Sequence, residues 1–196
     1  MKSLALIFAV AATLGASAVD AQSPVRIRGT ITAVDGNAIS VKTRDGRDVK
    51  LVLPDNVAVS VAKAARFEDL KQGDYVGATT TPGPDGSAVA VEVHYLPPTA
   101  GEGQSAWDLL PNSTMTNANV SGTVVANGKR EIMLQFKGAT QTIVVPQSAA
   151  IVRTVPGARS DIVVGEYVFA SAQVGADGAM TAPRVQVSKD GVRPPQ

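Results

Sequence analysis

Four side chains near the middle of the chain could hold a metal ion. His94, the only histidine, follows Glu92 by two residues, so both would lie on one face of a strand. Glu102 and Asp108 follow in a segment without a regular pattern. Imidazole and carboxylates together suit zinc or a similar divalent ion. The candidate metal ligands are His94, Asp108 and either Glu102 or Glu92, although no HxH, HExxH or cysteine cluster supports them and a lone histidine is often only solvated.

The same region would also supply a hydrolytic triad of Ser113, His94 and Asp108. Ser113 lacks the glycine pattern of a nucleophile elbow, and the one histidine would have to act as general base from near a strand end. The run 111–114 is more typical of turns in which Asn, Ser and Thr side chains bond to nearby backbone. Glycine-rich phosphate loops and EF-hand ligand series are absent from the sequence. We therefore expect no enzyme and no cofactor.

Binding is the activity that the remaining residues suit. Trp107, the only tryptophan, precedes a run of amide and hydroxyl side chains, a combination that suits a glycan or a strand of an envelope protein. The candidate ligand-binding residues are Tyr95, Trp107, Asp108, Asn112, Ser113, Thr114, Thr116 and Asn117. Alternatively, Trp107 only holds two domains together, or the chain is a divalent-metal-binding accessory protein of a periplasmic transport system.

These residues lie between two copies of one pattern. The run Asp69–Gly77 returns as Asp161–Phe169, and Pro54 returns as Pro146, all 92 positions apart. Gly29-Thr30 is expected to match Gly122-Thr123. Self-similarity at a fixed spacing indicates repeated structural units, and units of this length predict two tandem domains.

Each copy predicts three strands, a short helix and two further strands. Alternating apolar and polar residues mark the strands, as in Val25–Val34, and Asp-Gly pairs mark turns between them. The period changes over Ala62–Gln72, where a short helix is expected to end before Gly73, and 158–162 takes its place in the second copy. The predicted fold is all-β, with two tandem small OB-like Greek-key β-barrels joined by an irregular segment. Another small barrel or a sandwich is the alternative.

The N-terminal residues predict export. Lys2, an apolar run over 4–14 and a small-residue exit are typical of a signal peptide cleaved after Ala21, or after Ala18. Without cysteines there is neither a disulfide nor a lipid-anchor site, and no later stretch approaches the ~20 apolar residues of a membrane helix. We therefore expect a soluble periplasmic or secreted protein, with no transmembrane segment in the mature chain. A net charge of +1 and 4% aromatic residues argue against nucleic-acid binding.

The expected organisation has five parts. Residues 1–21 form a signal peptide, 22–96 the first barrel, 97–118 the inter-domain segment with Trp107, 119–189 the second barrel and 190–196 a polar tail. Pro183, inside the last strand, predicts an edge or a bulge there.

The runs His94–Pro97 and Gly101–Ala118 resemble a family of exported proteobacterial proteins of unknown function. The resemblance extends over nearly the whole mature chain and implies β-barrel domains. Some members of that family are labelled metal ABC transporter permeases, but this sequence has no predicted membrane helices of the kind a permease needs. The family often has a histidine after Gly-Glu-Gly, where this chain has Gln104, and that difference weakens a metal site built on the position.

Overall fold

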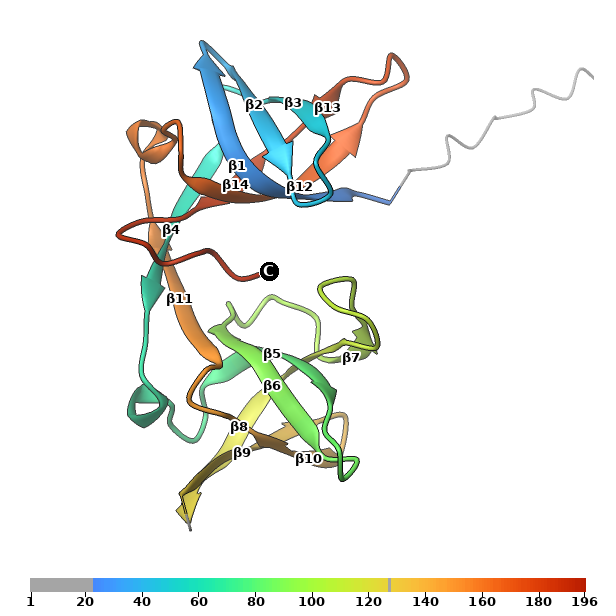
Figure 1. The fold of residues 1–196 in the computed structure, drawn as a ribbon, viewed down its shortest axis with the longest axis vertical. Helices are drawn as coiled ribbons and strands as arrows, with labels where there is room; N and C mark the ends of the chain where they lie inside the picture. Colours follow the sequence, from blue (N-terminus) through green and yellow to red (C-terminus); the bar gives the residue numbers. More distant parts are fainter. Residues whose placement is uncertain (1–22, 127) are drawn as a thin grey trace, which may run out of the picture.

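The computed structural model describes residues 23–126 and 128–196, which form an all-β fold without an α-helix (Figure 1). The expected signal peptide, residues 1–21, lies outside the described residues, as does Asn127. The first strands are β1 (Val25–Asp35), β2 (Ala38–Thr43), β3 (Asp48–Val52), β4 (Ala58–Ala64), β5 (Tyr75–Pro82) and β6 (Ala88–Tyr95). The later strands are β7 (Gly103–Ala106), β8 (Thr114–Ala126), β9 (Lys129–Phe136), β10 (Ala139–Val144), β11 (Ala150–Pro156), β12 (Tyr167–Val174), β13 (Met180–Thr181) and β14 (Arg184–Val187).

Backbone pairing closes two five-stranded barrels. Around the first barrel the order is β1–β2–β3–β13–β12, and β12 pairs again with β1. Around the second the order is β8–β9–β10–β6–β5, and β5 pairs again with β8. The pairs β3–β13 and β6–β10 are parallel, and the other pairs in these walls are antiparallel. Closing each sheet on itself pairs strand edges that would otherwise be open.

The barrels exchange strands between the two halves of the chain. The first combines β1–β3 with β12 and β13, and the second combines β8–β10 with β5 and β6 (Figure 1). The expected division into one barrel of residues 22–96 and another of 119–189 is therefore wrong. Both halves carry matching strands: Val168 of β12 lies opposite Gly29, and Val76 of β5 lies opposite Ala118. Because either half offers equivalent strands, the local residue pattern is the same with or without the exchange.

Strands β4 and β11 run between the barrels. They pair antiparallel, with Ala62 opposite Thr154, and lie side by side along one flank of the molecule (Figure 1). Strand β4 also pairs parallel with β14 of the first barrel, and β11 pairs parallel with β6 of the second. Strand pairing is therefore unbroken from one barrel to the other.

Each barrel has a hydrophobic core drawn from both halves. Ile27 and Leu51 pack with Val168 in the first core, while Val76 packs with Ile132 in the second. These side chains are at most 1% exposed, because alternation along each strand turns them inward. Burial of such a side chain contributes about 1.5–3 kcal/mol, so both cores depend on the exchange of strands.

The expected short helix in each copy is wrong, since each is a single 3-10 turn, η1 (Phe67–Asp69) and η2 (Arg159–Asp161). Strand β4 continues to Ala64, held by β11, and the backbone is extended at Arg66 before η1 and at Leu70 after it, so the helical segment is limited to one turn. Phe67 is nevertheless buried, in the core of the second barrel.

The inter-domain segment 97–118 is not irregular throughout. Strand β7 pairs with β8, and β8 begins at Thr114, before the expected start of the second barrel at residue 119. The extension occurs because β8 pairs with β7 on one side and with β5 on the other. Pro183 interrupts the last strand, separating β13 from β14, as its missing N–H requires.

The first strands of the two halves match differently from the expected alignment. The pairing of Gly29 with Val168 corresponds to that of Ala118 with Val76, so Gly29 is equivalent to Ala118 and not to Gly122. The longer β8–β9 hairpin accounts for the shift. A Cβ at Gly29 would lie 2.1 Å from the backbone oxygen of Lys42, so close approach of β2 requires glycine there.

Candidate functional site

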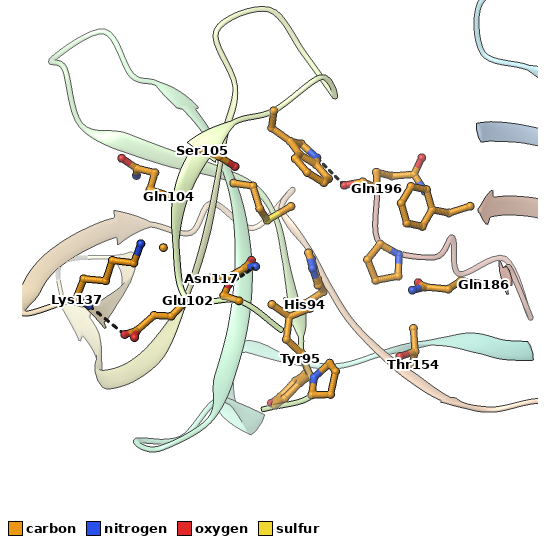
Figure 2. A pocket seen from close by; sticks show the side chains of 18 residues that line it. His94, Tyr95, Glu102, Gln104, Ser105, Asn117, Lys137, Thr154, Gln186 and Gln196 are labelled. Carbon is orange, nitrogen blue, oxygen red and sulfur yellow. Dashed lines mark hydrogen bonds between the residues drawn. The ribbon is translucent and has the colours of Figure 1, made fainter. Parts of the chain in front are cut away.

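A cavity of about 440 Å³ lies where the two barrels face each other (Figure 2). Its walls come from the end of β6, from β7 and β8, from β11, and from β12 and β14 of the first barrel. The lining residues are His94, Tyr95, Leu96, Pro97, Gly101, Glu102, Gly103, Gln104, Ser105, Trp107, Met115, Asn117, Lys137, Thr154, Phe169, Gln186, Pro195 and Gln196. Because these residues are far apart in the sequence, the cavity exists only once both barrels have formed.

His94 is a buried member of the cavity wall, only 6% exposed. Its Nδ1 lies 3.2 Å from Oε1 of the buried Glu92, but the angle is not that of a hydrogen bond. The Glu92 carboxylate accepts instead from the backbone N–H of Gln196, at 3.0 and 3.2 Å. The ring of His94 lies over Gly77, where an added Cβ would be 2.5 Å from Nε2. Gly77 therefore provides the space that the imidazole occupies.

The C-terminal residues form part of the cavity wall. Residues 190–196, expected as a polar tail, run between the barrels (Figure 1), and Pro194 and Pro195 are buried. The indole N–H of Trp107 donates to the backbone oxygen of Gln196 at 2.8 Å (Figure 2). This segment was not among the site residues predicted from the sequence. Its two consecutive prolines were the available signal, because prolines favour a preformed extended chain.

Three residues of the wall carry buried polar atoms without a hydrogen-bond partner among the described residues. These atoms are Nδ1 of His94, the hydroxyl of Tyr95 and Oε1 of Gln186. Burial raises the pKa of the Tyr95 hydroxyl above its ordinary value. An unpartnered buried polar group costs about 1–3 kcal/mol, but the protein itself covers these three atoms, so a ligand would reach them only after the wall had shifted.

Trp107 and Asp108 attach the inter-domain segment to the first barrel. The guanidinium of Arg26 stacks on the Trp107 ring, 4.1 Å from its centre. Arg28, which is 5% exposed, donates two hydrogen bonds of 3.0 Å to the Asp108 carboxylate. These bonds hold the pKa of Asp108 below its ordinary value. Arg44 donates to the backbone oxygens of Asp108 and Leu109.

The proposed triad of Ser113, His94 and Asp108 is not assembled. The Ser113 hydroxyl accepts from the backbone N–H of Leu110 at 3.1 Å, and lies 2.9 Å from the backbone oxygen of Trp107. No hydrogen bond joins any two triad members among the described residues, and Asp108 is held by Arg28. Ser113 therefore closes the 107–113 turn, as the run of turn-forming residues indicated.

The candidate metal ligands His94, Glu102 and Asp108 each contact a different partner. Glu102 accepts from the backbone N–H of Lys137 at 3.1 Å, Asp108 pairs with Arg28, and His94 neighbours Glu92. Over residues 23–126 and 128–196, no group of three His, Asp or Glu side chains is placed to hold a metal ion.

The eight candidate ligand-binding residues divide between several places. Tyr95, Trp107 and Asn117 line the cavity, and the Asn117 amide donates to the backbone oxygen of Gly101 at 3.0 Å. Asn112 and Thr114 line a separate hollow, and the buried Thr116 accepts from Gln104 at 2.9 Å. Asp108 and Ser113 hold the segment in place as described above. The structure thus brings three of the predicted residues together and adds His94 and three glutamines to them: Gln104, Gln186 and Gln196.

No protein-family model matches this chain, and neither a curated protein nor a solved structure does. Within the part of the chain that the structure describes, no helix has the length and apolarity needed to cross a membrane.

Proposed function

We propose that this chain is an exported, non-enzymatic binding protein whose ligand occupies the cavity between the barrels. The observation that carries this is the cavity of about 440 Å³ between the barrels, whose wall combines the rings of Trp107 and Phe169 with polar side chains from both barrels. Ligand sites are preferentially concave and placed between domains, which supports this location.

A glycan is the ligand class that suits this wall best. Trp107 and Phe169 supply apolar ring surface. The side-chain carbonyl oxygens of Gln104 and Asn117 supply acceptors, since their amide N–H groups already donate within the protein. Sugars combine the two requirements, since their C–H faces pack on aromatic rings while their hydroxyls pair with amides. Two ionisable residues of opposite charge, Glu102 and Lys137, lie in the wall, and Glu102 accepts a bond from the Lys137 backbone, so the wall does not select a strongly charged ligand.

We further propose that both barrels are OB-like. Three features of the first barrel support this. Its first three strands are consecutive and antiparallel, the third strand pairs parallel with the last, and the fourth pairs with both the last and the first. In barrels of this kind oligosaccharides bind on a strand face and its flanking loops. Export to the periplasm is supported by the N-terminal residues 1–21 and by the resemblance to exported proteobacterial proteins.

Trp107 offers a direct test, because it is the only tryptophan and it lines the cavity. Tryptophan fluorescence is titrated with chitohexaose, cellohexaose and maltohexaose, and heats are measured by calorimetry on the same samples. We expect a saturable fluorescence change with at least one of them.

The matched variants are Asn117→Ala and Asn119→Ala, on the same strand. Asn117 lines the cavity, whereas Asn119 is exposed and does not. Asn117→Ala is expected to weaken binding by about tenfold, the effect of one lost hydrogen bond in an enclosed site, and Asn119→Ala to leave it unchanged. Absence of heat and of a fluorescence change with all three sugars would overturn glycan binding here.

A further inference from the structure

A second hollow, of about 350 Å³, lies on the first barrel and is rich in arginine. Arg26 and Arg28 reach it from β1, two residues apart and hence from one face of the strand. Arg44 and Arg47 reach it from the β2–β3 turn. The wall also includes Asp45, Asp108 and Thr43. This hollow shares no lining residue with the cavity between the barrels, although Arg26 stacks on Trp107.

The hollow carries excess positive charge. Four guanidinium groups face two carboxylates, and both carboxylates are ionised at neutral pH. Hydrogen bonds from Thr43 and then Arg47 lower the pKa of Asp45 to about 2, and bonds from Arg28 lower that of Asp108. Two positive charges therefore remain uncompensated within the wall, which favours an anion.

Two arginines of the hollow have hydrogen-bond donors without a partner among the described residues. Nε of Arg28 is buried and has no partner among the described residues, although Arg28 is 5% exposed overall. Arg26 stacks on Trp107 and lies 3.7 Å from Asp108, but it donates no hydrogen bond to any described residue. The side chains of Arg26 and Arg47 are 42% and 63% exposed, so a ligand can reach both.

We propose that this hollow binds a phosphate group, with Arg26 and Arg47 as direct contacts and Arg28 as the buried charge behind them. The planar fork of a guanidinium pairs with two phosphate oxygens at once, and several forks around one hollow suit a tetrahedral anion. Arg44 is already committed to the backbone oxygens of Asp108 and Leu109, so it fixes the wall. The phosphate is either free or carried by the head group of an anionic lipid.

Calorimetric titration with inorganic phosphate at constant ionic strength tests this. We expect saturable heat with the wild-type chain, weakened by about tenfold in each of Arg26→Gln and Arg47→Gln, since each removes a charge-assisted hydrogen bond. Arg184→Gln is the matched control, because Arg184 is an exposed arginine outside the hollow. It is expected to bind phosphate as the wild type does. Circular dichroism melting shows whether each variant is folded, and Arg47→Lys, which keeps the charge, should recover part of the affinity.

Two outcomes would overturn phosphate binding here: no saturable heat with the wild type, or equal heats from the Gln variants and the control. Sedimentation with phosphatidylcholine vesicles, with and without phosphatidylglycerol, identifies the source. Sedimentation that needs phosphatidylglycerol, Arg26 and Arg47 supports a lipid head group. Phosphate binding without sedimentation supports a free phosphate.

Discussion

The indole nitrogen of Trp107 donates a hydrogen bond of 2.8 Å to the backbone oxygen of Gln196, joining the inter-barrel segment to the C-terminal residues. The same two residues line the cavity. Gln196 is bonded in turn to Glu92, next to His94, so one connected set of contacts forms this wall.

Two substitutions of Trp107 distinguish the contribution of its hydrogen bond to stability from that of its packing. Trp107→Phe keeps a ring and removes the donor, so we expect the free energy of unfolding to fall by about 1 kcal/mol. Trp107→Ala also removes the ring, and we expect a fall of about 3 kcal/mol. Urea unfolding followed by circular dichroism measures both. Glycan binding should be lost in Trp107→Ala under conditions in which the variant is still folded; retained binding would leave Trp107 only a structural role.

Gly77→Ala should disturb the cavity by pushing His94 from its place. A Cβ at Gly77 would lie 2.5 Å from Nε2 and 2.8 Å from Cε1 of His94, so the ring has to move. We expect a loss of about 1–3 kcal/mol in the free energy of unfolding, as for overpacked sites, together with weaker glycan binding.

Gly101→Ala is the control for that variant. Gly101 also lines the cavity, but a Cβ there meets no atom within 4 Å. Its stability should stay within about 0.5 kcal/mol of the wild type. Adding His94→Ala to Gly77→Ala should recover part of the lost stability, and no recovery would show that the strain lies elsewhere.

Acid should release the segment that contains Trp107. The pKa of Asp108 is lower in the folded chain than its ordinary value, because Arg28 donates to the carboxylate. The stability from this pair is therefore present above the ordinary Asp pKa of 3.8 and is lost as the pH falls through the lowered value. The Asp108 side chain is 52% exposed, so solvent screening keeps the effect small.

Fluorescence of Trp107 against pH measures this release. We expect a transition with its midpoint below pH 3.8 in the wild type and none in Asp108→Asn. Asp48→Asn, on β3 and outside the arginine hollow, should keep the transition. A transition that persists in Asp108→Asn would assign it to other groups.

The exchange of strands can be tested with paired cysteines, because the chain has none of its own. Arg26 lies opposite Ser171 on neighbouring strands β1 and β12. We expect Arg26→Cys with Ser171→Cys to form a disulfide on mild oxidation, detected by peptide mass spectrometry. Thr79 stands in β5 at the position equivalent to Ser171, so Arg26→Cys with Thr79→Cys would cross-link only if each half closed its own barrel. Cross-linking of that second pair alone would contradict the exchange.

The sequence predicted the strands better than it predicted their partners. Alternation along Val25–Val34 marks β1 correctly, because burial on one face leaves a local signature. The partner of β1 leaves none: β5 and β12 carry similar residues, such as Tyr75 and Tyr167, and present equivalent edges. Strand content was therefore predictable, whereas the assignment of strands to barrels was not.

The candidate site was predictable to a smaller extent. Trp107 and Tyr95 stood out as aromatic residues near polar ones, and both line the cavity. The sequence left Asp108 as a candidate ligand. Its actual partner, Arg28, lies 80 positions away, and sequence spacing gives no sign of that contact. The role of Gln196 depends likewise on long-range packing.

The pairing of β1 with β12 also governs when the chain can fold. The first barrel lacks part of its wall until β12 and β13, close to the C-terminus, have been made. Contacts between such distant residues form slowly, because a long loop has to close first. A ribosome-bound chain therefore cannot complete the native first barrel until nearly all of its residues have been added.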